Sequence, residues 1–315
     1  SVETGLTAYQ VVGKRLYAGA AGSVLCGLAA LGAGAVYAVG FSGDDGEGFD
    51  MRRKLGEAGI TIDEVLVSGK VMTPVYTKPV FLRGKRGAEF GAPDYKIEET
   101  NRLDHRNINP TPRSVEDRII ASIEKLTPEL DAIIALDQLT VEGHGVITPR
   151  VREALAETAA RNPRLVLYAD SRAFIAAFRN SIIKCNDHEA LLMVRGKAPP
   201  PGEDADTVDA GACLMELAKN SGKEVFVSCG RRGVLVREGN APRLIPAIPV
   251  SGPIDIVGAG DACSAGIVSA LCAGAGAAEA ACMGNLTASI AIQVIGAAGT
   301  ASRGQVRARY REALE

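Results

Sequence analysis

Residues 254–266 read IDIVGAGDACSAG and place a glycine-rich turn, a carboxylate and a run of small residues within thirteen positions. Gly258 and Gly260 have no side chains, so their backbone N–H groups can approach an anion closely. The small-residue run predicts a helix, whose N-terminus turns the positive end of its dipole toward the same anion. Asp261, in the first turn of that helix, is placed to accept the proton of an attacking hydroxyl. The stretch therefore has the arrangement of a phosphoryl-transfer site.

Short apolar runs alternate with helical patterns along most of the chain. Apolar runs of this length are typical of parallel strands that are covered on both faces. The alternation predicts a doubly wound α/β fold with a mainly parallel sheet, helices on both faces and a site at the carboxyl ends of the strands. The expected strands cover residues 35–40, 131–136, 164–169, 181–184 and 224–228. The expected helices cover residues 20–31, 47–58, 114–126, 148–160, 206–219, 260–274, 276–295 and 303–314.

The composition agrees with a soluble enzyme. The 315 residues, of which 47% are hydrophobic, suit one large α/β domain over residues 1–315 with a small appendage. A net charge of −2 gives no electrostatic footprint for nucleic acid or an anionic membrane. Seven cysteines without a Cys-x-x-Cys pair, and no signal peptide, indicate a reducing, cytoplasmic compartment. The uncharged stretches 16–43 and 262–278 are expected to be buried elements rather than membrane spans, because glycines interrupt the first and the second is shorter.

The stretch around Asp261 resembles the second signature of the PfkB, or ribokinase-like, carbohydrate kinases, which reads Asp-Thr-Thr-Gly-Ala-Gly-Asp before a small-residue helix. Ile256 and Val257 stand at the two threonine positions. The resemblance implies a ribokinase-like fold in which Gly258-Ala259-Gly260 forms the anion hole and Asp261 is the catalytic base for a sugar hydroxyl. Alone, a Gly-x-Gly-Asp turn would be an ordinary turn whose carboxylate complements the helix dipole.

Two segments near the amino end resemble motifs on the sugar side of the family's site. Residues 19–24 (GAAGSV) look like the first signature, with Gly19 in its glycine pair and Ser23 at the position of an asparagine. Residues 43–48 (GDDGEG) are similar to a Gly-Asp-Asp-x-x-Gly turn that opens the next helix. The resemblance implies that Gly19, Ser23 and Asp45 bind the substrate. Alone, the second segment would be a turn and a helix cap.

Three features in the second half of the chain resemble the nucleotide side. Residues 184–189 (KCNDHE) are similar to a Lys-Pro-Asn-x-x-Glu segment that lies near the nucleotide phosphates and magnesium, although Asn186 followed by Glu189 is also a capping-box pattern. Residues 227–233 (VSCGRRG) resemble a Thr-x-Gly-x-x-Gly turn, which alone would be a hairpin turn. The resemblance implies ATP and Mg²⁺ as cofactors, and it leaves room for a monovalent cation. The residues so assigned are Asn186, Glu189, Ser228, Gly230, Gly233 and Asn285, with Glu189 as the metal residue.

The segment from residue 73 to residue 90 breaks the alternation. It predicts a strand over residues 73–82, a basic turn at 83–87 and a return through Phe90. The resemblance implies that strands inserted near residues 70–104 form a β lid over the sugar, and that the lids of two subunits pair into a homodimer. A lid would exclude water from the transfer and limit ATP hydrolysis. The alternative is an edge hairpin whose basic side chains discourage aggregation.

Within the family, the chain is most similar to kinases of heptose phosphates. The residues that carry this likeness are 101–104 (NRLD), Asp137 with 143–148 (GHGVIT), and 170–172 (DSR). Lys78, Arg102 and Arg172 are candidates for gripping a phosphate already present on the sugar, because basic side chains bind phosphate strongly. Each of them alone is an ordinary surface residue. Asp137, at the carboxyl end of an expected strand, is a better candidate for lining the substrate site.

The match covers residues 1–299 but departs from the family at its start. Family members begin with a strand that bears Gly-Asp and a second aspartate and holds the sugar hydroxyls. The opening residues 1–5 (SVETG) resemble the segment that comes after that strand, and a first residue other than methionine indicates a trimmed or processed chain. The substrate grip is therefore the least complete part of the predicted site.

We expect an ATP-dependent phosphotransferase that phosphorylates a hydroxyl of a sugar or sugar phosphate, with no nucleic-acid or membrane partner. The alternative is a degenerate homologue that holds a nucleotide or sugar as a regulatory ligand without turnover, an interpretation favoured by the absent first strand and opposed by the intact Gly-Ala-Gly-Asp. A nicotinamide dehydrogenase is disfavoured, because no Gly-x-Gly-x-x-Gly follows the first strand with an acidic residue about twenty positions further on.

Overall fold

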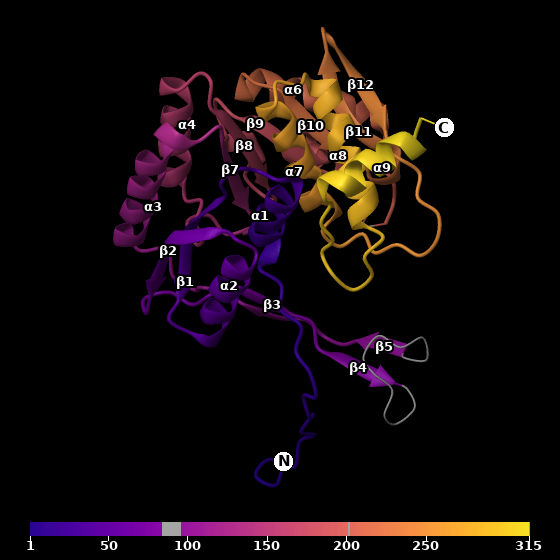
Figure 1. Ribbon diagram of the computed structural model, residues 1–315. Helices are drawn as coiled ribbons and strands as arrows, with labels where there is room; N and C mark the ends of the chain where they lie inside the picture. The colour runs from indigo at the N-terminus through magenta and orange to yellow at the C-terminus, as the bar shows by residue number, and fades with distance from the viewer. Residues whose placement is uncertain (84–95, 201, 315) are drawn as a thin grey trace.

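The computed structural model describes residues 1–83, 96–200 and 202–314, and a six-stranded sheet forms its centre (Figure 1). Four neighbouring strands run parallel, and two antiparallel strands extend the sheet at one edge. The parallel strands are β7 (Ala132–Asp137), β8 (Val166–Ser171), β9 (Ile182–Asn186) and β10 (Val225–Ser228), and the antiparallel strands are β11 (Gly233–Glu238) and β12 (Ala241–Pro246). The four parallel strands are those expected from the sequence, and the doubly wound α/β fold is confirmed.

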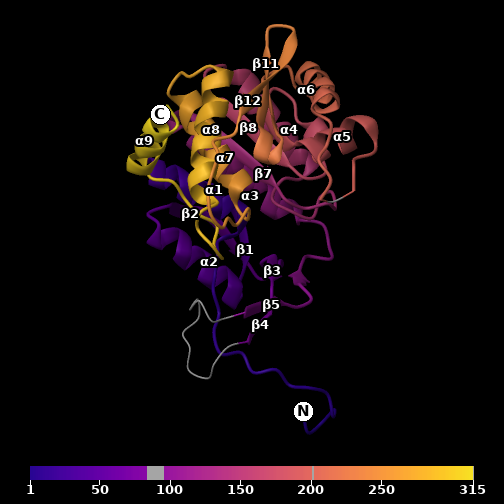
Figure 2. The same cartoon turned by 90° about the vertical axis from the view of Figure 1, so that its right-hand side faces the viewer.

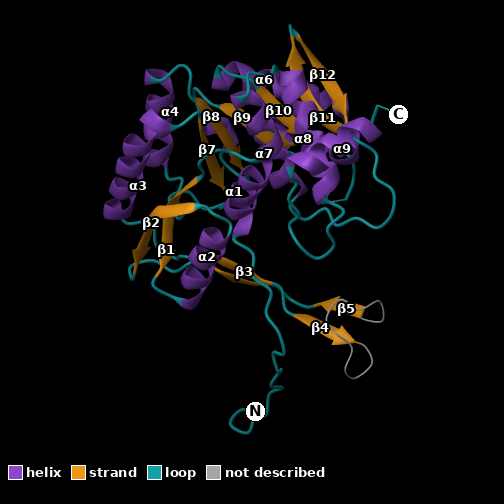
Figure 3. Ribbon diagram, viewed as in Figure 1, coloured by secondary structure: helices purple, strands orange, loops and turns teal. Residues whose placement is uncertain are grey.

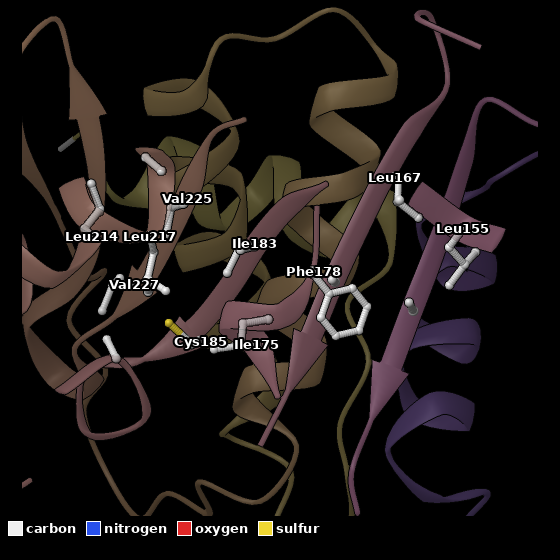
Figure 4. Packing of buried hydrophobic residues seen from close by; sticks show 14 of the residues in the cluster. Leu155, Leu167, Ile175, Phe178, Ile183, Cys185, Leu214, Leu217, Val225 and Val227 are labelled. Atoms are coloured by element: carbon white, nitrogen blue, oxygen red, sulfur yellow. The ribbon is translucent and has the colours of Figure 1, made fainter. Parts of the chain in front are cut away.

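Helices cover both faces of this sheet (Figure 2). Successive strand residues point to opposite faces: Leu167 and Ala169 of β8 pack into one buried cluster and Tyr168 into another. The helices on the first face are α3 (Arg113–Leu126), α4 (Pro149–Arg161), α5 (Asp187–Arg195) and α6 (Thr207–Ser221). Those on the second are α7 (Ala259–Cys272) and α8 (Ala277–Ala291), with α1 (Gly19–Leu31) against α7 and α9 (Arg303–Glu312) against α8. Figure 4 shows the first cluster.

The helices begin where their sequence signals place them. Each of the eight helices expected from the sequence starts within one residue of its predicted start. Thr148 caps α4 by accepting a hydrogen bond from the Val151 N–H, and Asp206 caps α6 in the same way. The expected helix 276–295 was too long at its end, because α8 ends at Ala291 and the chain turns away toward Gly296, whose φ is +73°. Short 3₁₀ helices connect other elements: η1 (Thr127–Glu129), η2 (Ile175–Ala177) and η3 (Gly230–Arg232).

A second parallel sheet lies beside the first and shares its core. It pairs β1 (Tyr37–Gly43) with β2 (Thr61–Ser68), which α2 (Gly46–Glu57) connects. Phe41 of β1 packs in the same buried cluster as Ala135 of β7 and as residues of α3. Within the described residues, β1 pairs only with β2, and β7 pairs only with β8. The sheet predicted as continuous is therefore divided between β1 and β7.

Four short strands form two further sheets, and Figure 3 shows β4 and β5 projecting from the body beside the amino-terminal residues. The prediction of a single strand over residues 73–82 was wrong, because the structure has two strands with different partners there. β3 (Val75–Thr77) pairs with β6 (Leu103–His105), and β4 (Val80–Arg83) pairs with β5 (Lys96–Glu99). The break falls at Lys78 and Pro79, and proline cannot donate a ladder hydrogen bond. Residues 84–87 of the expected turn, and Phe90, lie outside the described residues. Tyr9 meets Phe81 of β4, with ring centroids 5.3 Å apart.

The two uncharged stretches form ordinary elements of the fold. Residues 16–43 contain α1 and β1, and residues 262–278 contain most of α7 and the start of α8. Among the residues that the structure describes, no helix has both the length and the apolar character needed to cross a bilayer.

Candidate active site

The carboxyl ends of the parallel strands bring several predicted site residues to one edge of the sheet. Asp137 ends β7 and lies opposite Ser171, the last residue of β8. Asn186 ends β9 and lies opposite Ser228, the last residue of β10. Because the four strands run parallel, these residues line one edge in the order of the strands.

The glycine turn leads directly into α7. Gly258 is the N-cap residue with φ +82°, in the left-handed region, and a methyl group added to it would lie 2.9 Å from Ala298 Cβ. No side chain among the described residues caps α7, so the first-turn N–H groups have no side-chain acceptor. Gly266 lets α7 approach α8 closely, because a methyl group there would lie 2.4 Å from Thr287 Oγ1. The turn therefore combines an open helix N-terminus with tight packing behind it, as the small residues predicted.

Asp261 occupies the first turn of α7 and is partly buried. Burial raises the pKa of its carboxyl from 3.8 to about 6, and the nearby negative charge of Asp170 acts in the same direction, whereas the positive charges of Lys184 and Arg172 lower the pKa. A carboxyl group with a pKa near neutral can take up a proton from a hydroxyl more readily than an ordinary aspartate. Its position and protonation both fit a general base.

An ion pair behind the turn was not assigned by the sequence prediction. Lys184 Nζ donates to Asp170 Oδ2 at 2.9 Å, and both side chains are buried. The pair forms because Asp170 of β8 lies directly opposite Lys184 of β9. The Lys184 ammonium also lies beside Gly260, since a methyl group added to that glycine would be 3.1 Å from Nζ. Both residues stand within motifs of the sequence, Asp-Ser-Arg and Lys-Cys-Asn, but only the strand register reveals that they meet.

Asn186 and Glu189 form a complete capping box at the start of α5. The Glu189 N–H donates to Asn186 Oδ1 at 2.7 Å, and the Asn186 N–H donates to Glu189 Oε2 at 2.8 Å. The alternative expected for this segment, a helix cap, is thus confirmed, and the proposed nucleotide contacts stay a prediction. Burial raises the pKa of Glu189, and the charge of Asp170 acts with it, while Lys184 and Arg172 oppose it.

Glu189 is the residue predicted to hold Mg²⁺, and it lies in the first turn of α5. Among the described residues, no group of three or more His, Cys, Asp or Glu side chains is placed to bind a metal ion. Mg²⁺ in phosphoryl-transfer sites is commonly held by one or two carboxylates and the phosphates of the nucleotide. A single carboxylate such as that of Glu189, in the first turn of α5, is compatible with that mode.

The other predicted nucleotide residues form the β10–β11 hairpin and its neighbour. Ser228 Oγ donates to the Cys185 carbonyl at 3.3 Å. Gly230 has φ +54° with open space around it, and Gly233 has φ +117° with the Ile245 carbonyl 2.1 Å from the place of a Cβ. The hairpin turn is confirmed. The buried Asn285 side chain donates to the carbonyls of Ile245 and Pro246, and this ties α8 to the end of β12.

The predicted substrate residues are spread over three parts of the molecule. Ser23 Oγ donates to the Gly19 carbonyl in the first turns of α1. Asp45 caps α2 by accepting from the Gly48 N–H, and it also accepts hydrogen bonds from the Thr73 N–H and hydroxyl. The expected turn and cap are therefore confirmed there. Asp137 is buried at the sheet edge and accepts from Ser171 Oγ at 2.9 Å, and burial raises its pKa although that hydrogen bond opposes the rise.

Lys78 lies between β3 and β4, Arg102 lies between β5 and β6, and both are exposed. Lys78 Nζ lies 3.2 Å from Glu99 Oε1, and Arg102 Nη2 lies 2.6 Å from Asp104 Oδ2. The Arg102 guanidinium also stacks 4.7 Å above the Tyr76 ring. These basic groups are paired with neighbouring acidic groups, so a phosphate would have to compete with those carboxylates.

The fold defines a class of proteins. The chain superposes on Arabidopsis thaliana ribokinase complexed with ribose and ATP with a TM-score of 0.65 and 18% identity, covering 93% of this chain and 86% of that one. It superposes on Escherichia coli phosphofructokinase-2 in complex with substrates and products with a TM-score of 0.65 and 17% identity, covering 94% and 88%. The fold is therefore ribokinase-like.

The sequence places the chain within that class. Residues 149–303 match the profile of the pfkB family carbohydrate kinases. Over 286 residues the chain is 27% identical to Bifunctional protein HldE of Bradyrhizobium sp. (strain ORS 278), covering 90% of this chain and 54% of that protein. Over residues 149–303, just under half of its length, the chain is therefore similar to the pfkB family of carbohydrate kinases. It spans about half the length of the curated relatives it matches.

Proposed function

We propose that this protein transfers the γ-phosphoryl group of ATP to a hydroxyl of a sugar or sugar phosphate. The observation that carries the proposal is the partly buried Asp261, whose pKa is raised to about 6, in the first turn of an uncapped helix that begins at a glycine turn. In that place Asp261 takes the proton of the attacking hydroxyl. The Gly258-Ala259-Gly260 turn donates N–H hydrogen bonds to the transferring phosphoryl group, so negative charge is stabilised as it moves.

The nucleotide binds along the sheet edge in this proposal. Asn186 and Ser228, at the ends of β9 and β10, face the phosphates, and the β10–β11 hairpin with Gly230 and Gly233 lies along the nucleotide. Asn285 shapes the adenine side by fixing the end of β12. Mg²⁺ would supply charge neutralisation between the phosphates, with Glu189 holding it. A monovalent cation remains part of the proposal as an activator.

The acceptor is proposed to be a sugar phosphate, and heptose phosphates are the first to test, because the sequence most resembles that branch. Gly19, Ser23, Asp45 and Asp137 would contact the sugar. Lys78, Arg102 and Arg172 would bind its phosphate, and the strands β3 to β6, which flank the first two, would close over it as a lid and pair in a homodimer. On binding, Lys78 would exchange Glu99, and Arg102 would exchange Asp104, for phosphate oxygens.

ADP release from ATP and Mg²⁺ tests this function across hexoses, pentoses, nucleosides, and heptose and hexose phosphates, with Asp261→Asn run in parallel. We expect turnover with one acceptor class and a loss of about 10²- to 10⁴-fold in kcat in the variant. Glu64→Gln, which breaks an ion pair with Lys125 between β2 and α3, is the control expected to leave kcat unchanged. Nucleotide binding without product for any acceptor would instead support the regulatory homologue.

A further inference from the structure

The buried pair of Lys184 and Asp170 has no role in the proposed function. Lys184 Nζ lies 2.9 Å from Asp170 Oδ2 and against Gly260, and the two side chains retain 8% and 10% of their exposure. We propose that Asp170 is a positioning residue that holds the Lys184 ammonium behind the glycine turn, where its charge reinforces the anion hole. This role deepens the proposed phosphoryl transfer and rests on it.

The position of the pair argues against a purely structural role. Taking both charges out of water costs free energy that the pairing itself often fails to recover, so apolar residues of similar size would hold the fold as well. The side chains around the ion pair are small or already hydrogen-bonded. The Tyr168 hydroxyl donates to Ser264 Oγ at 3.0 Å, and the small Cys263 side chain is buried nearby. The first turn of α7, which lies next to the ion pair, gives a reason for charged residues at this place.

Lys184 has donors left for a ligand. An ammonium carries three N–H donors, and within the described part of the chain its one hydrogen-bond acceptor is Asp170. The ammonium lies on the side of Gly260 where a side chain would stand. Glycine at position 260 therefore does two things: it frees the backbone for an anion, and it leaves room for the charge behind it.

The charges that act on the site come from four elements. Asp261 belongs to α7, Glu189 to α5, Arg172 comes directly after β8, and the Lys184–Asp170 pair joins β9 and β8. Lys184 favours the ionised form of Asp261, whereas Asp170 disfavours it. If Asp170 holds Lys184 in place, both side chains act on the base and on the anion hole together.

The kinetic test compares Asp170→Asn, Lys184→Met and the double variant, each with the acceptor that gives turnover in the ADP-release assay. We expect Lys184→Met to lower kcat about 100-fold with little change in the KM of the sugar, because the ammonium acts on charge that develops during transfer. Asp170→Asn should lower kcat less, and the double variant should be no worse than Lys184→Met, since Asp170 acts through the lysine. Independent, multiplying losses would overturn the positioning role.

A second readout does not need turnover. ¹³C NMR of the Asp261 carboxyl in the ligand-free protein gives its titration midpoint, which should move up in Lys184→Met and down in Asp170→Asn, while Glu64→Gln leaves it in place. Unmoved midpoints in both folded variants, with cooperative melting to show the fold, would refute the proposal. If the wild-type protein has no kinase activity but the midpoints move in the variants, the arrangement of charges is supported while the proposed function fails. If Asp170→Asn does not fold, Lys184→Met decides alone.

Discussion

Replacing Asp261 by asparagine is expected to lower kcat about 10²- to 10⁴-fold and to stabilise the protein at neutral pH. Burial raises the pKa of this carboxyl from 3.8 to about 6. A folded-state pKa above the unfolded value means that the protonated form stabilises the fold. That contribution is fully present below about pH 4 and is lost as pH rises through about 6. Asparagine imitates the protonated form and keeps the contribution at pH 7.

The shift gives the size of the effect. At about 1.36 kcal/mol per pKa unit, a shift of about two units is worth up to about 3 kcal/mol at pH 7. Because Asp261 is partly exposed, this is an upper bound. With an unfolding entropy of about 2.1 cal/mol/K per residue, about 3 kcal/mol corresponds to a rise of about 5 °C in Tm for a chain of this length.

Thermal unfolding of wild type and Asp261→Asn should be followed from pH 4 to pH 8. We expect equal Tm values near pH 4 and a growing advantage of the variant above pH 6. Asp45→Asn is the matched control with the opposite sign, because hydrogen bonds from Thr73 and Gly48 lower the pKa of Asp45 although burial opposes this. It should lose stability at neutral pH. An Asp261→Asn variant that is destabilised at pH 7, or stabilised equally at every pH, would refute the raised pKa.

The same site gives three further predictions. The kcat/KM of the wild type should rise with pH around a midpoint near 6 as Asp261 ionises, and a profile flat from pH 5 to pH 8 would contradict its role as base. Gly260→Ala should lower kcat at least tenfold, because its methyl group would lie 3.1 Å from Lys184 Nζ. The control is Gly56→Ala, a helical position with open space around it, which should keep kcat and gain about 0.5–1 kcal/mol of stability in urea unfolding. Glu189→Gln keeps an oxygen for the capping box, so its Tm should change little while the Mg²⁺ concentration for half-maximal activity rises, and an unchanged Mg²⁺ requirement would remove Glu189 as the metal residue.

The sequence predicted best those segments whose structure depends on residues close to them along the chain. The glycine turn before Asp261 needs only a left-handed Gly258 and a helix after it, and residues within a few positions determine both. The parallel strands are short apolar runs, and helix starts such as Thr148 carry their own capping side chains. Local chemistry therefore determined the fold class and the centre of the candidate site.

The tertiary structure decided the features that join distant segments. Lys184 and Asp170 meet because β9 lies beside β8 in one register, and a shift of β9 by one residue would turn Lys184 to the other face of the sheet. The break at Pro79 gave the two halves of one expected strand different partners, β6 and β5. The environment of Asp261 likewise depends on β8, β9 and α7 packing together, since burial and nearby charge, rather than residue type, set its pKa.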